Sequence, residues 1–511
     1  MAHSNGTLAE LLRNLDLGAS VAETDNLLQA ARVDTSAFAD LLNDRVDLVP
    51  GTKGSGKSAL FRIIIDFLPD HLLRERKVVI AHGVHAPGDA VFHAFTDQFA
   101  TLDEEEFVSF WCVYLVSLAH EQFVKSARYQ EHIRGATKEI ATFRDACARA
   151  RIPEIEAPRS LRNVLEWSLG VLKSWRPKVT FSPPGDSGEF GLDLFGNAPT
   201  RTTNGKTQGT SSDLPKYVND IKENLEAILR QSNLSLWLMV DRLDEIFPRR
   251  SPVERNALRG LLRAMRFFTS PHVRVKVFLR DDMLEEVVQD PEGFTALTHI
   301  TARQADTLRW TPEQLVYMLL RRIFANREIS EYLQISQERL DASAEYRQEC
   351  FYRVFPPTVH RGAKQASTLK WIYNRCADGR GVVTPRDVLD LVLRAKQRQQ
   401  DICASDTEGV SESVIGASAM IYGYEELSRR KLQTYLQAEF PHLQEGIQKF
   451  KRGKTEYSLG ALKLLLGSGW DATAHDLVSI GFLAESKKRG TTSYSIPFIY
   501  RHSLQLTQGK A

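Results

Sequence analysis

Apolar residues along the chain follow two spacings, which alternate between residues 44 and 305. Four short runs are rich in apolar residues, at 46–49, 77–81, 234–240 and 273–279. Three longer stretches repeat apolar residues at the spacing of a helix, at 57–67, 103–127 and 253–268. The run at 234–240 is the most apolar of all and is typical of a parallel strand buried on both faces. Strands that alternate with helices predict an α/β fold with a parallel sheet covered by helices.

The pattern of apolar residues differs before and after this core, and in one segment within it. Two short helices are expected at 8–15 and 24–31. Residues 176–213 contain two alternating runs followed by a stretch of Gly, Ser, Thr, Asn and Pro, which indicates a hairpin and a mobile loop inserted into the core. Residues 311–399 are helical almost throughout, and from 457 onward the order helix, helix, strand, basic turn, strand is typical of a winged helix.

These changes predict four segments in the chain. They are an N-terminal helical lead-in, a core that carries the insertion, an α-helical lid and a winged-helix-like domain, at 1–43, 44–305, 306–405 and 415–511. A length of 511 residues is sufficient for two to four packed units, at roughly 100–200 residues each.

Composition and charge exclude several classes of protein. The chain has 42% hydrophobic and 25% charged residues, which are average values for a globular protein. This composition excludes a chain that is mainly disordered, collagen-like or coiled coil. Lys and Arg number 66 against 64 Asp and Glu, which argues against a protein that coats nucleic acid or a membrane surface. The apolar run at 107–119 is too short to span a bilayer, and the first residues lack the features of a signal peptide. Five dispersed cysteines fit reduced thiols, so we expect a cytoplasmic protein without a membrane segment.

One segment carries recognisable chemistry. Residues 51–58 match the phosphate-binding loop G-x-x-x-x-G-K-[ST] at every fixed position, with a predicted strand before it and a predicted helix after it. The glycines let successive backbone N–H groups point at one anion, while Lys57 supplies charge to the β- and γ-phosphates and the Ser58 hydroxyl binds Mg²⁺. The chain lacks the guanine-reading motif Asn-Lys-x-Asp, so ATP is favoured. The predicted nucleotide-binding residues of the loop are Gly51, Thr52, Lys53, Gly54, Ser55, Gly56, Lys57, Ser58 and Ala59.

An acidic residue follows the most apolar strand. Asp241 would be costly in that buried position unless it held water on Mg²⁺, so we predict that it completes the metal site. Asp244 and Glu245 follow three residues later, and one of them is expected to orient or deprotonate the attacking water. Glu245 is favoured over Asp244, and a salt bridge to a nearby arginine is the structural alternative for each.

Several arginines are candidates for contact with phosphate. Arg280 ends the last predicted strand of the core, where it can reach the γ-phosphate; a surface ion pair with Asp281 is the alternative. Arg386 follows Pro385 at the start of a lid helix and is expected to contact the nucleotide from that side. One arginine of the helix at 253–268 is a candidate for action in trans on a neighbouring subunit, although a solvated helix face explains the same residues: Arg259, Arg263 and Arg266.

Three segments together resemble bacterial P-loop ATPases of the AAA+/STAND group. They read Gly-Thr-Lys-Gly-Ser-Gly-Lys-Ser-Ala-Leu-Phe, Val-Asp-Arg-Leu-Asp-Glu and Phe-Leu-Arg-Asp-Asp, at 51–61, 240–245 and 278–282. Residues 308–323 resemble the bridge between the nucleotide core and the lid in that group. The chain is more closely similar to ATPases encoded beside nucleases or other effectors in anti-phage defence loci. Many AAA+ proteins place Asp and Glu side by side, whereas Arg242 and Leu243 intervene here, which leaves the identity of the catalytic acid open.

Three hypotheses about function follow. The first, which the resemblance implies, is an ATP-hydrolysing switch that forms a homo-oligomer and regulates a separate effector protein, such as a nuclease, in phage defence. The second is a DNA-binding initiator or loader. Residues 421–511 carry 13 Lys and Arg against 8 Asp and Glu, a net charge of +5, and Lys487, Lys488 and Arg489 are expected on the wing, where they can contact DNA phosphates. A winged helix used for protein contacts is the alternative to DNA binding. The third hypothesis is a nucleotide-binding scaffold that barely hydrolyses ATP.

Overall fold

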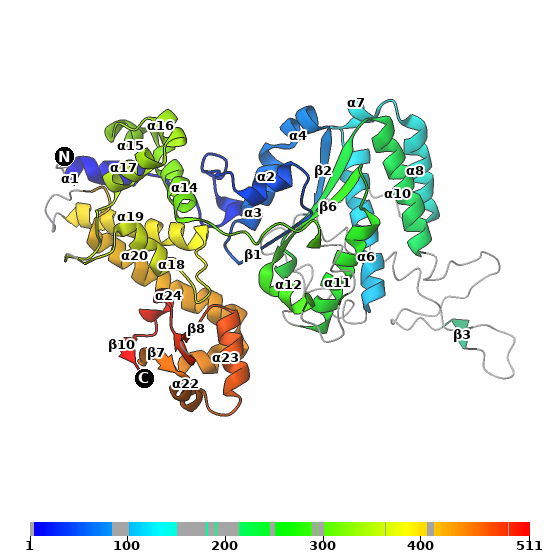
Figure 1. Cartoon of the computed structure of the whole chain (residues 1–511). Coiled ribbons are helices and arrows are strands. Elements are labelled where there is room, and N and C mark those ends of the chain that lie inside the picture. The colour runs from blue at the N-terminus through cyan, green and yellow to red at the C-terminus, as the bar shows by residue number, and fades with distance from the viewer. Residues whose placement is uncertain are drawn as a thin grey trace.

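The computed structural model has two lobes joined near the middle of the chain (Figure 1). One lobe holds a parallel sheet and its helices, and the other holds a helical region and a small second sheet (Figure 1). The structure describes residues 5–83, 102–150, 180–181, 190–191, 214–245, 251–288, 294, 301–362, 364–405, 413–488 and 490–511.

The first lobe is built on a four-stranded parallel sheet. Its strands, in the order in which they lie side by side, are β1 (Leu48–Gly51), β6 (Val273–Arg280), β5 (Ser235–Val240) and β2 (Val78–Gly83). Because the strands are parallel, β1, β6 and β5 all end at one edge of the sheet. The predicted α/β fold with a parallel sheet is confirmed.

Both faces of this sheet are buried, because successive side chains of a strand point to opposite faces. One face packs Val49, Ile80 and Phe278 against α2 (Ser36–Leu42), α3 (Lys57–Arg62), a π-helical turn (Ile63–Phe67) and α4 (Pro69–Arg76). The other face packs Leu48 and Val79 against five helices: α6 (Glu104–Ala119), α8 (Thr137–Arg149), α10 (Leu214–Gln231), α11 (Pro252–Phe267) and α12 (Asp281–Val288). A short α7 (Gln130–Ile133) precedes α8.

The most apolar helix lies inside this lobe. Among the described residues, one stretch has the length and apolar character of a membrane span, Glu104–Val124, and 83% of its apolar window is buried inside the protein. Trp111 Nε1 donates to the carbonyl of Ala257 in α11 at 2.8 Å, and a Cβ added at Gly260 would lie 2.6 Å from the Cβ of Phe107. Close packing between α6 and α11 therefore accounts for the apolar residues of α6.

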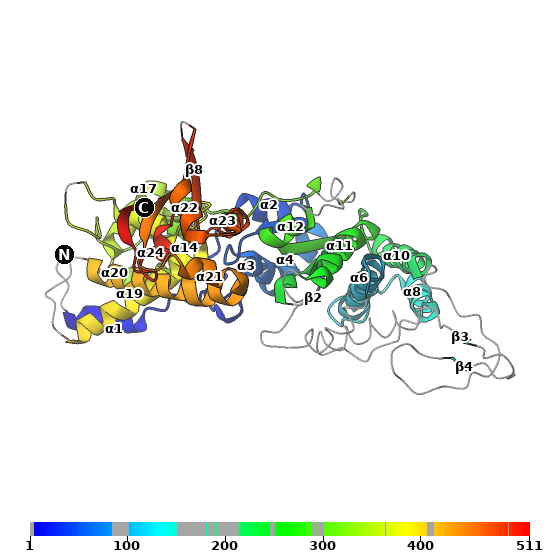
Figure 2. The ribbon, with the colours of Figure 1, turned by 90° about the horizontal axis from the view of Figure 1, so that it is seen from below.

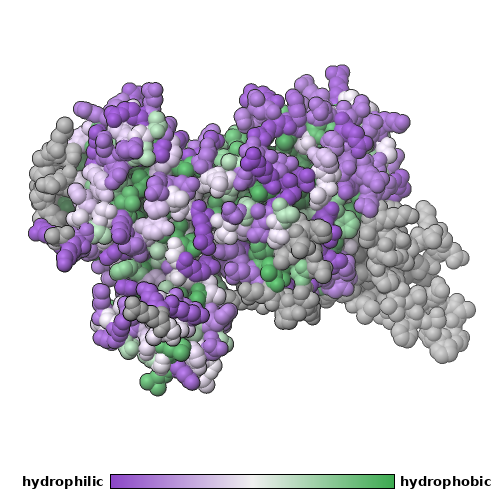
Figure 3. Space-filling view, in the orientation of Figure 1, coloured by the Kyte–Doolittle hydropathy of each residue, from purple (hydrophilic) through white to green (hydrophobic). Residues whose placement is uncertain are grey.

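Hydrophilic side chains line the top of both lobes in Figure 3.

The second lobe contains the helices predicted between 311 and 399. They are α14 (Pro312–Phe324), α15 (Arg327–Tyr332), α16 (Gln337–Ala342), α17 (Ala344–Val354), α18 (Thr368–Cys376) and α19 (Pro385–Ser405). α20 (Ala417–Arg430) packs along α19 and continues into a π-helical turn, η7 (Lys431–Gln437). The N-terminal helix α1 (Asn5–Asn14) also packs along α19. These helices share one buried cluster with the C-terminal residues, so the second lobe has a continuous core.

The C-terminal region has the order predicted for a winged helix. α22 (Leu459–Leu466) and α23 (Trp470–Ser479) precede the antiparallel pair β8 (Ala484–Lys488) and β9 (Thr491–Ser495). β7 (Lys454–Ser458), α24 (Phe498–Arg501) and β10 (Thr507–Lys510) complete it, and the sheet order is β10-β7-β9-β8. The β8–β9 hairpin projects from the lobe in Figure 2. Residues 457 and 458, expected in a helix, belong to β7 instead.

The predicted helix at 24–31 is wrong. Residues 22–24 form a single 3₁₀ turn, and no helix continues through the described residues 25–31. The Asp25 carboxylate accepts hydrogen bonds from the backbone N–H groups of Ala19 and Leu27, and this local pattern competes with a helix.

The insertion at 176–213 is described at four residues. β3 (Thr180–Phe181) pairs with β4 (Phe190–Gly191) in the antiparallel sense expected of the hairpin. The loop predicted after it lies outside the described residues.

Candidate nucleotide site

The phosphate-binding loop connects β1 to α3, as its sequence predicts. Gly54 and Gly56 adopt φ values of +84° and +101°, a region of backbone space that side chains with a Cβ rarely enter. At Gly51 an added Cβ would lie 2.5 Å from Ser55 Oγ, so the tight loop also excludes a side chain there. The chain then enters α3 at Lys57, and the first N–H groups of that helix are oriented to bind an anion.

Several polar atoms of the loop are buried with few partners. Lys57 is 9% exposed, and its Nζ donates to the carbonyls of Gly51 and Thr52 at 2.7 and 2.9 Å. Burial lowers the pKa of Lys57, against the opposing effect of Asp244 and Asp241. The Thr52 and Ser55 hydroxyls are buried without a hydrogen-bond partner among the described residues. Unpaired buried hydroxyls are costly.

Asp241 and Ser58, the two residues expected to hold Mg²⁺, are hydrogen-bonded to each other. Asp241, directly after β5, is 7% exposed and accepts a hydrogen bond from the Ser58 side chain. Burial raises the pKa of Asp241 to about 6, although Ser58 and Lys57 oppose this shift. The described residues contain no group of three or more His, Cys, Asp or Glu arranged to hold a metal. Mg²⁺ at a nucleotide usually takes one or two protein ligands together with phosphate oxygens and water, so this pair fits that ion.

The residues after Asp241 point in different directions. Arg242 adopts a left-handed φ of +61° and forms an ion pair with Glu23 of the N-terminal lead-in. Leu243 is 1% exposed and packs in the core of the first lobe. Asp244 lies among cations: burial raises its pKa, but Arg280 and Lys57 outweigh that effect, and the net shift is downward. Arg242 and Leu243, which separate the acids in the sequence, thus attach this segment to the lead-in and the core.

Glu245 ends the 3₁₀ turn Leu243–Glu245, and its side chain lies outside the described residues. The choice between Asp244 and Glu245 as the catalytic acid stays a prediction. The structure places Asp244 beside Lys57 and Arg280.

Arg280 lies at the sheet edge where its position in the sequence puts it. Its side chain is 4% exposed and contacts three carboxylates. Nε and Nη2 donate to the two oxygens of Asp282 at 3.0 and 2.8 Å, and Nη1 donates to Asp244 at 3.2 Å and to Glu439 at 2.7 Å. The alternative of a surface pair with Asp281 is wrong, since Asp281 pairs with Arg380 of the second lobe at 3.6 Å.

A cavity of about 290 Å³ joins these groups. The loop, Asp241, Asp244 and Arg280 line one side, and residues of the second lobe line the other, among them Trp310, Met318, Arg322, Arg386 and Leu389. The lead-in closes a third side with Ala19, Ser20, Val21, Ala22, Glu23 and Leu28. Although Glu23, Asp25 and Arg32 also line it, the cavity has apolar side chains of the lead-in opposite the charged groups of the sheet edge, as a site for a base and its phosphates requires.

Arg386, expected to contact the nucleotide from the second lobe, lines this cavity. It is at the start of α19, its Nε donates to the Ser20 carbonyl at 3.2 Å, and a Cβ added at Gly54 would lie 3.1 Å from its Cβ. The three arginines of α11 do not line the cavity. Arg259 and Arg263 donate to Glu104 at 2.7 and 2.9 Å within the same chain, which disfavours action in trans, and Arg266 is exposed.

The sequence did not reveal the contribution of the lead-in and of two further residues. Arg322 and Asp25 form a buried ion pair at 2.6 Å that fixes the lead-in to α14. Trp310 Nε1 donates to the Ser55 carbonyl at 2.7 Å, and Glu439 reaches Lys53 and Arg280 from beyond η7. No periodicity or motif in the sequence marks the segment 16–25 as part of a binding site.

A phosphate-binding loop after the first strand, an acid at the end of another parallel strand and helices on both faces define a P-loop NTPase fold. No protein-family model matches the chain, and no curated protein matches it. The chain is similar to a solved structure of the Aeropyrum pernix ORC2 protein in ADPNP–ADP complexes. The identity is 12%, the TM-score is 0.38, and the match covers 92% of this chain and 91% of that one.

Proposed function

We propose that this protein is an ATP-binding, Mg²⁺-dependent ATPase that acts as a molecular switch. The observation that supports this most directly is the cavity between the lobes, where Lys57 and Ser58 of the phosphate-binding loop face Asp241 and Arg280.

Each site residue has a role in this proposal. The loop N–H groups and Lys57 hold the β- and γ-phosphates, and Ser58 and Asp241 hold Mg²⁺. The metal, when bound, neutralises phosphate charge. Asp244 or Glu245 orients the attacking water, while Arg280 and Arg386 contact phosphate from the sheet edge and from the second lobe.

The position of the cavity supports a switch rather than a simple hydrolase. Trp310 and Arg386 belong to the second lobe, yet they contact Ser55 of the loop and Ser20 of the lead-in. A nucleotide in the cavity would contact both lobes, so the loss of the γ-phosphate would change how firmly they hold together. Homo-oligomer formation, an effector partner, a role in phage defence and a cytoplasmic location rest on the family resemblance and the sequence.

Steady-state ATP hydrolysis with Mg²⁺ tests the proposal, with Lys57→Ala as the blank. We expect turnover in the wild-type protein and none above background in Lys57→Ala. Equal turnover in both proteins would contradict the proposed site. Binding of ATP without turnover would favour the third hypothesis, a static scaffold.

A second candidate function is DNA binding through the C-terminal hairpin, which projects from its lobe (Figure 2). Lys487 and Lys488 are exposed at its end, and Arg489 follows outside the described residues. Two phosphate contacts would contribute roughly 2 to the slope of log affinity against log salt. If DNA stimulates turnover and Lys487→Ala with Lys488→Ala lowers that slope by about 2, the loader hypothesis becomes the better one. If DNA has no effect on turnover, the partner-controlled switch is favoured.

A further inference from the structure

Glu439 belongs to the second lobe and forms an ion pair with the phosphate-binding loop. It follows η7, and its carboxylate pairs with Lys53 of the loop and accepts a hydrogen bond from Arg280 Nη1 at 2.7 Å. The Glu439 side chain is 14% exposed. A carboxylate from the second lobe thus bridges two cations that line the nucleotide cavity.

The three carboxylates around Arg280 differ in how they are held. Asp282 is two residues away, in the first turn of α12, and Asp244 follows the neighbouring strand β5. Glu439 is 159 residues away and belongs to the other lobe. Nη1 donates to both Asp244 and Glu439, so a phosphate that binds Arg280 through Nη1 must displace one of these two carboxylates. Glu439 is the one that can leave without disturbing the sheet.

We propose that Glu439 occupies the place of the γ-phosphate in the nucleotide-free protein, and that ATP displaces it whereas ADP does not. This inference rests on the proposed function. A γ-phosphate offers three acceptor oxygens and more negative charge than a carboxylate, so it competes effectively for Lys53 and Arg280. ADP lacks that group and leaves the bridge in place.

The surroundings of Glu439 connect this exchange to the second lobe. Phe440, the next residue, is 1% exposed in the core of that lobe. Lys431, at the start of η7, donates to both oxygens of Asp387 at 3.0 and 2.8 Å, one residue after Arg386. Displacement of Glu439 therefore strains η7 or moves the lobe. The ion pair between Arg380 of the second lobe and Asp281 at the sheet edge would remain.

Nucleotide affinities test the competition directly. Glu439→Gln keeps the shape of the side chain and removes its charge. We expect it to raise the affinity for ATPγS about tenfold, within the usual range of coupling between sites, and to leave the affinity for ADP unchanged. Glu445→Gln is the matched control, since that glutamate lies in the same lobe with its side chain 89% exposed. It should change neither affinity.

The outcomes separate this inference from the proposed function. An unchanged ratio of ATPγS to ADP affinity in Glu439→Gln, while the wild-type protein binds both, would overturn the inference and leave the ATPase proposal intact. Failure of the wild-type protein to bind either nucleotide would overturn both.

Hydrogen exchange of the wild-type protein gives a measurement that needs no variant. If ATP releases Glu439, backbone amides of residues 431–443 should exchange faster with ATPγS than with ADP. Equal exchange with the two nucleotides would contradict the displacement of Glu439.

Discussion

The two ends of strand β1 carry buried charges that are arranged in opposite ways. At its amino end, Asp44 and Asp47 face Lys276 of β6. At its carboxyl end, Lys57 and Asp241 face the cavity. The same sheet thus holds two charged clusters, and their hydrogen bonding distinguishes them.

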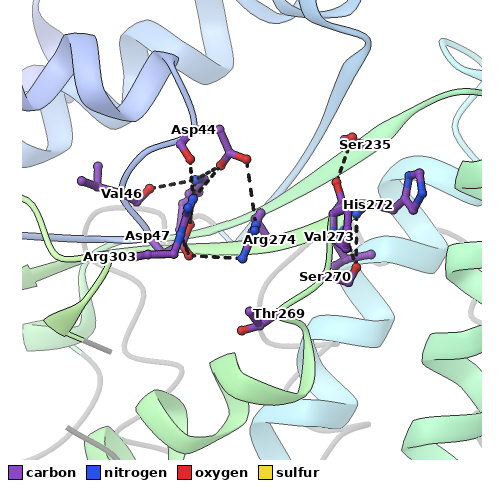
Figure 4. A network of polar contacts seen from close by, with 12 residues as sticks. Asp44, Val46, Asp47, Ser235, Thr269, Ser270, His272, Val273, Arg274 and Arg303 are labelled. Carbon is purple, nitrogen blue, oxygen red and sulfur yellow. Dashed lines mark hydrogen bonds and ion pairs between the residues drawn. The ribbon is translucent and has the colours of Figure 1, made fainter. Parts of the chain in front are cut away.

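We call the cluster at the amino end closed because the ammonium group at its centre is fully hydrogen-bonded, although Asp47, Arg274 and Arg303 also line a cavity of about 230 Å³ (Figure 4). Lys276 is fully buried, and its Nζ donates to Asp44, to Asp47 at 2.7 Å and to the Val46 carbonyl at 2.7 Å. Arg303 Nε donates to the other oxygen of Asp47 at 2.6 Å, and Arg274 lies at the rim, 3.9 Å from each carboxylate. All three protons of the ammonium group have an acceptor, so this cluster stabilises the fold.

The cluster at the carboxyl end is open. Lys57 donates to carbonyls of its own loop, while the hydroxyls of Thr52 and Ser55 have no partner among the described residues. A buried charge with its partners in place is typical of structure, whereas charged groups that line a cavity, as Lys57, Asp241 and Arg280 do here, are typical of a binding site. Four substitutions test this difference.

The largest effect is expected at the open end. Lys57→Ala should lower kcat/KM for ATP by at least about 10³-fold, because the charge that stabilises the transferred phosphate is lost. The free energy of unfolding without nucleotide should not fall, since a buried ammonium group is removed. Parallel ATPase assays and urea denaturation check both parts. A loss of stability to match the loss of activity would contradict the prediction.

At the closed end the pattern should reverse. Lys276→Met removes the central cation of this cluster and leaves Asp44 and Asp47 with Arg303 and Arg274 as their cationic partners, a loss that typically costs about 3 kcal/mol. Urea denaturation followed by tryptophan fluorescence measures this, because Trp237 lies 4.8 Å below the ammonium group. Folded protein should still bind ATP. A destabilisation below about 1 kcal/mol would show that the cluster is not structural.

Asp241→Asn should weaken the binding of Mg²⁺ without destabilising the fold. We expect the Mg²⁺ concentration for half-maximal turnover to rise about 30-fold, because one charged ligand is replaced by a neutral one. Titration of Mg²⁺ at saturating ATP measures the change. Unaltered Mg²⁺ dependence would assign the metal to other residues.

The smallest effect is expected for Thr52→Val, which removes an unpaired buried hydroxyl at nearly constant volume. The nucleotide-free protein should gain about 1 kcal/mol of stability. Thermal unfolding with and without ATP checks this, and the gain should shrink when ATP is present. A loss of stability without nucleotide would mean that the hydroxyl is already satisfied.

The sequence predicted those parts of the site that depend on local order. The loop at 51–58, Asp241 and Arg280 each follow directly from a strand, and parallel strands bring their ends together. Such residues can be placed from the periodicity of the chain alone.

Long-range contacts escaped the same reasoning. Arg322 pairs with Asp25 across 297 residues, and Arg280 bonds Glu439 across 159 residues. Nothing in the neighbourhood of these residues indicates their partners. The helix expected at 24–31 failed for a related reason, since tertiary contacts of Asp25 and Glu23 outweigh local helix preference there.

Isothermal titration of Mg²⁺ and ATPγS into three proteins tests the central difference most directly. They are the wild-type protein, Lys57→Ala from the open end and Asp44→Asn from the closed end, where Asn suits the φ of +54° at residue 44. The wild-type protein and Asp44→Asn should bind with equal affinity, and Lys57→Ala should bind at least about 100-fold more weakly. Equal binding by Lys57→Ala, or an equal loss in Asp44→Asn, would contradict the assignment of the nucleotide to the open end of β1.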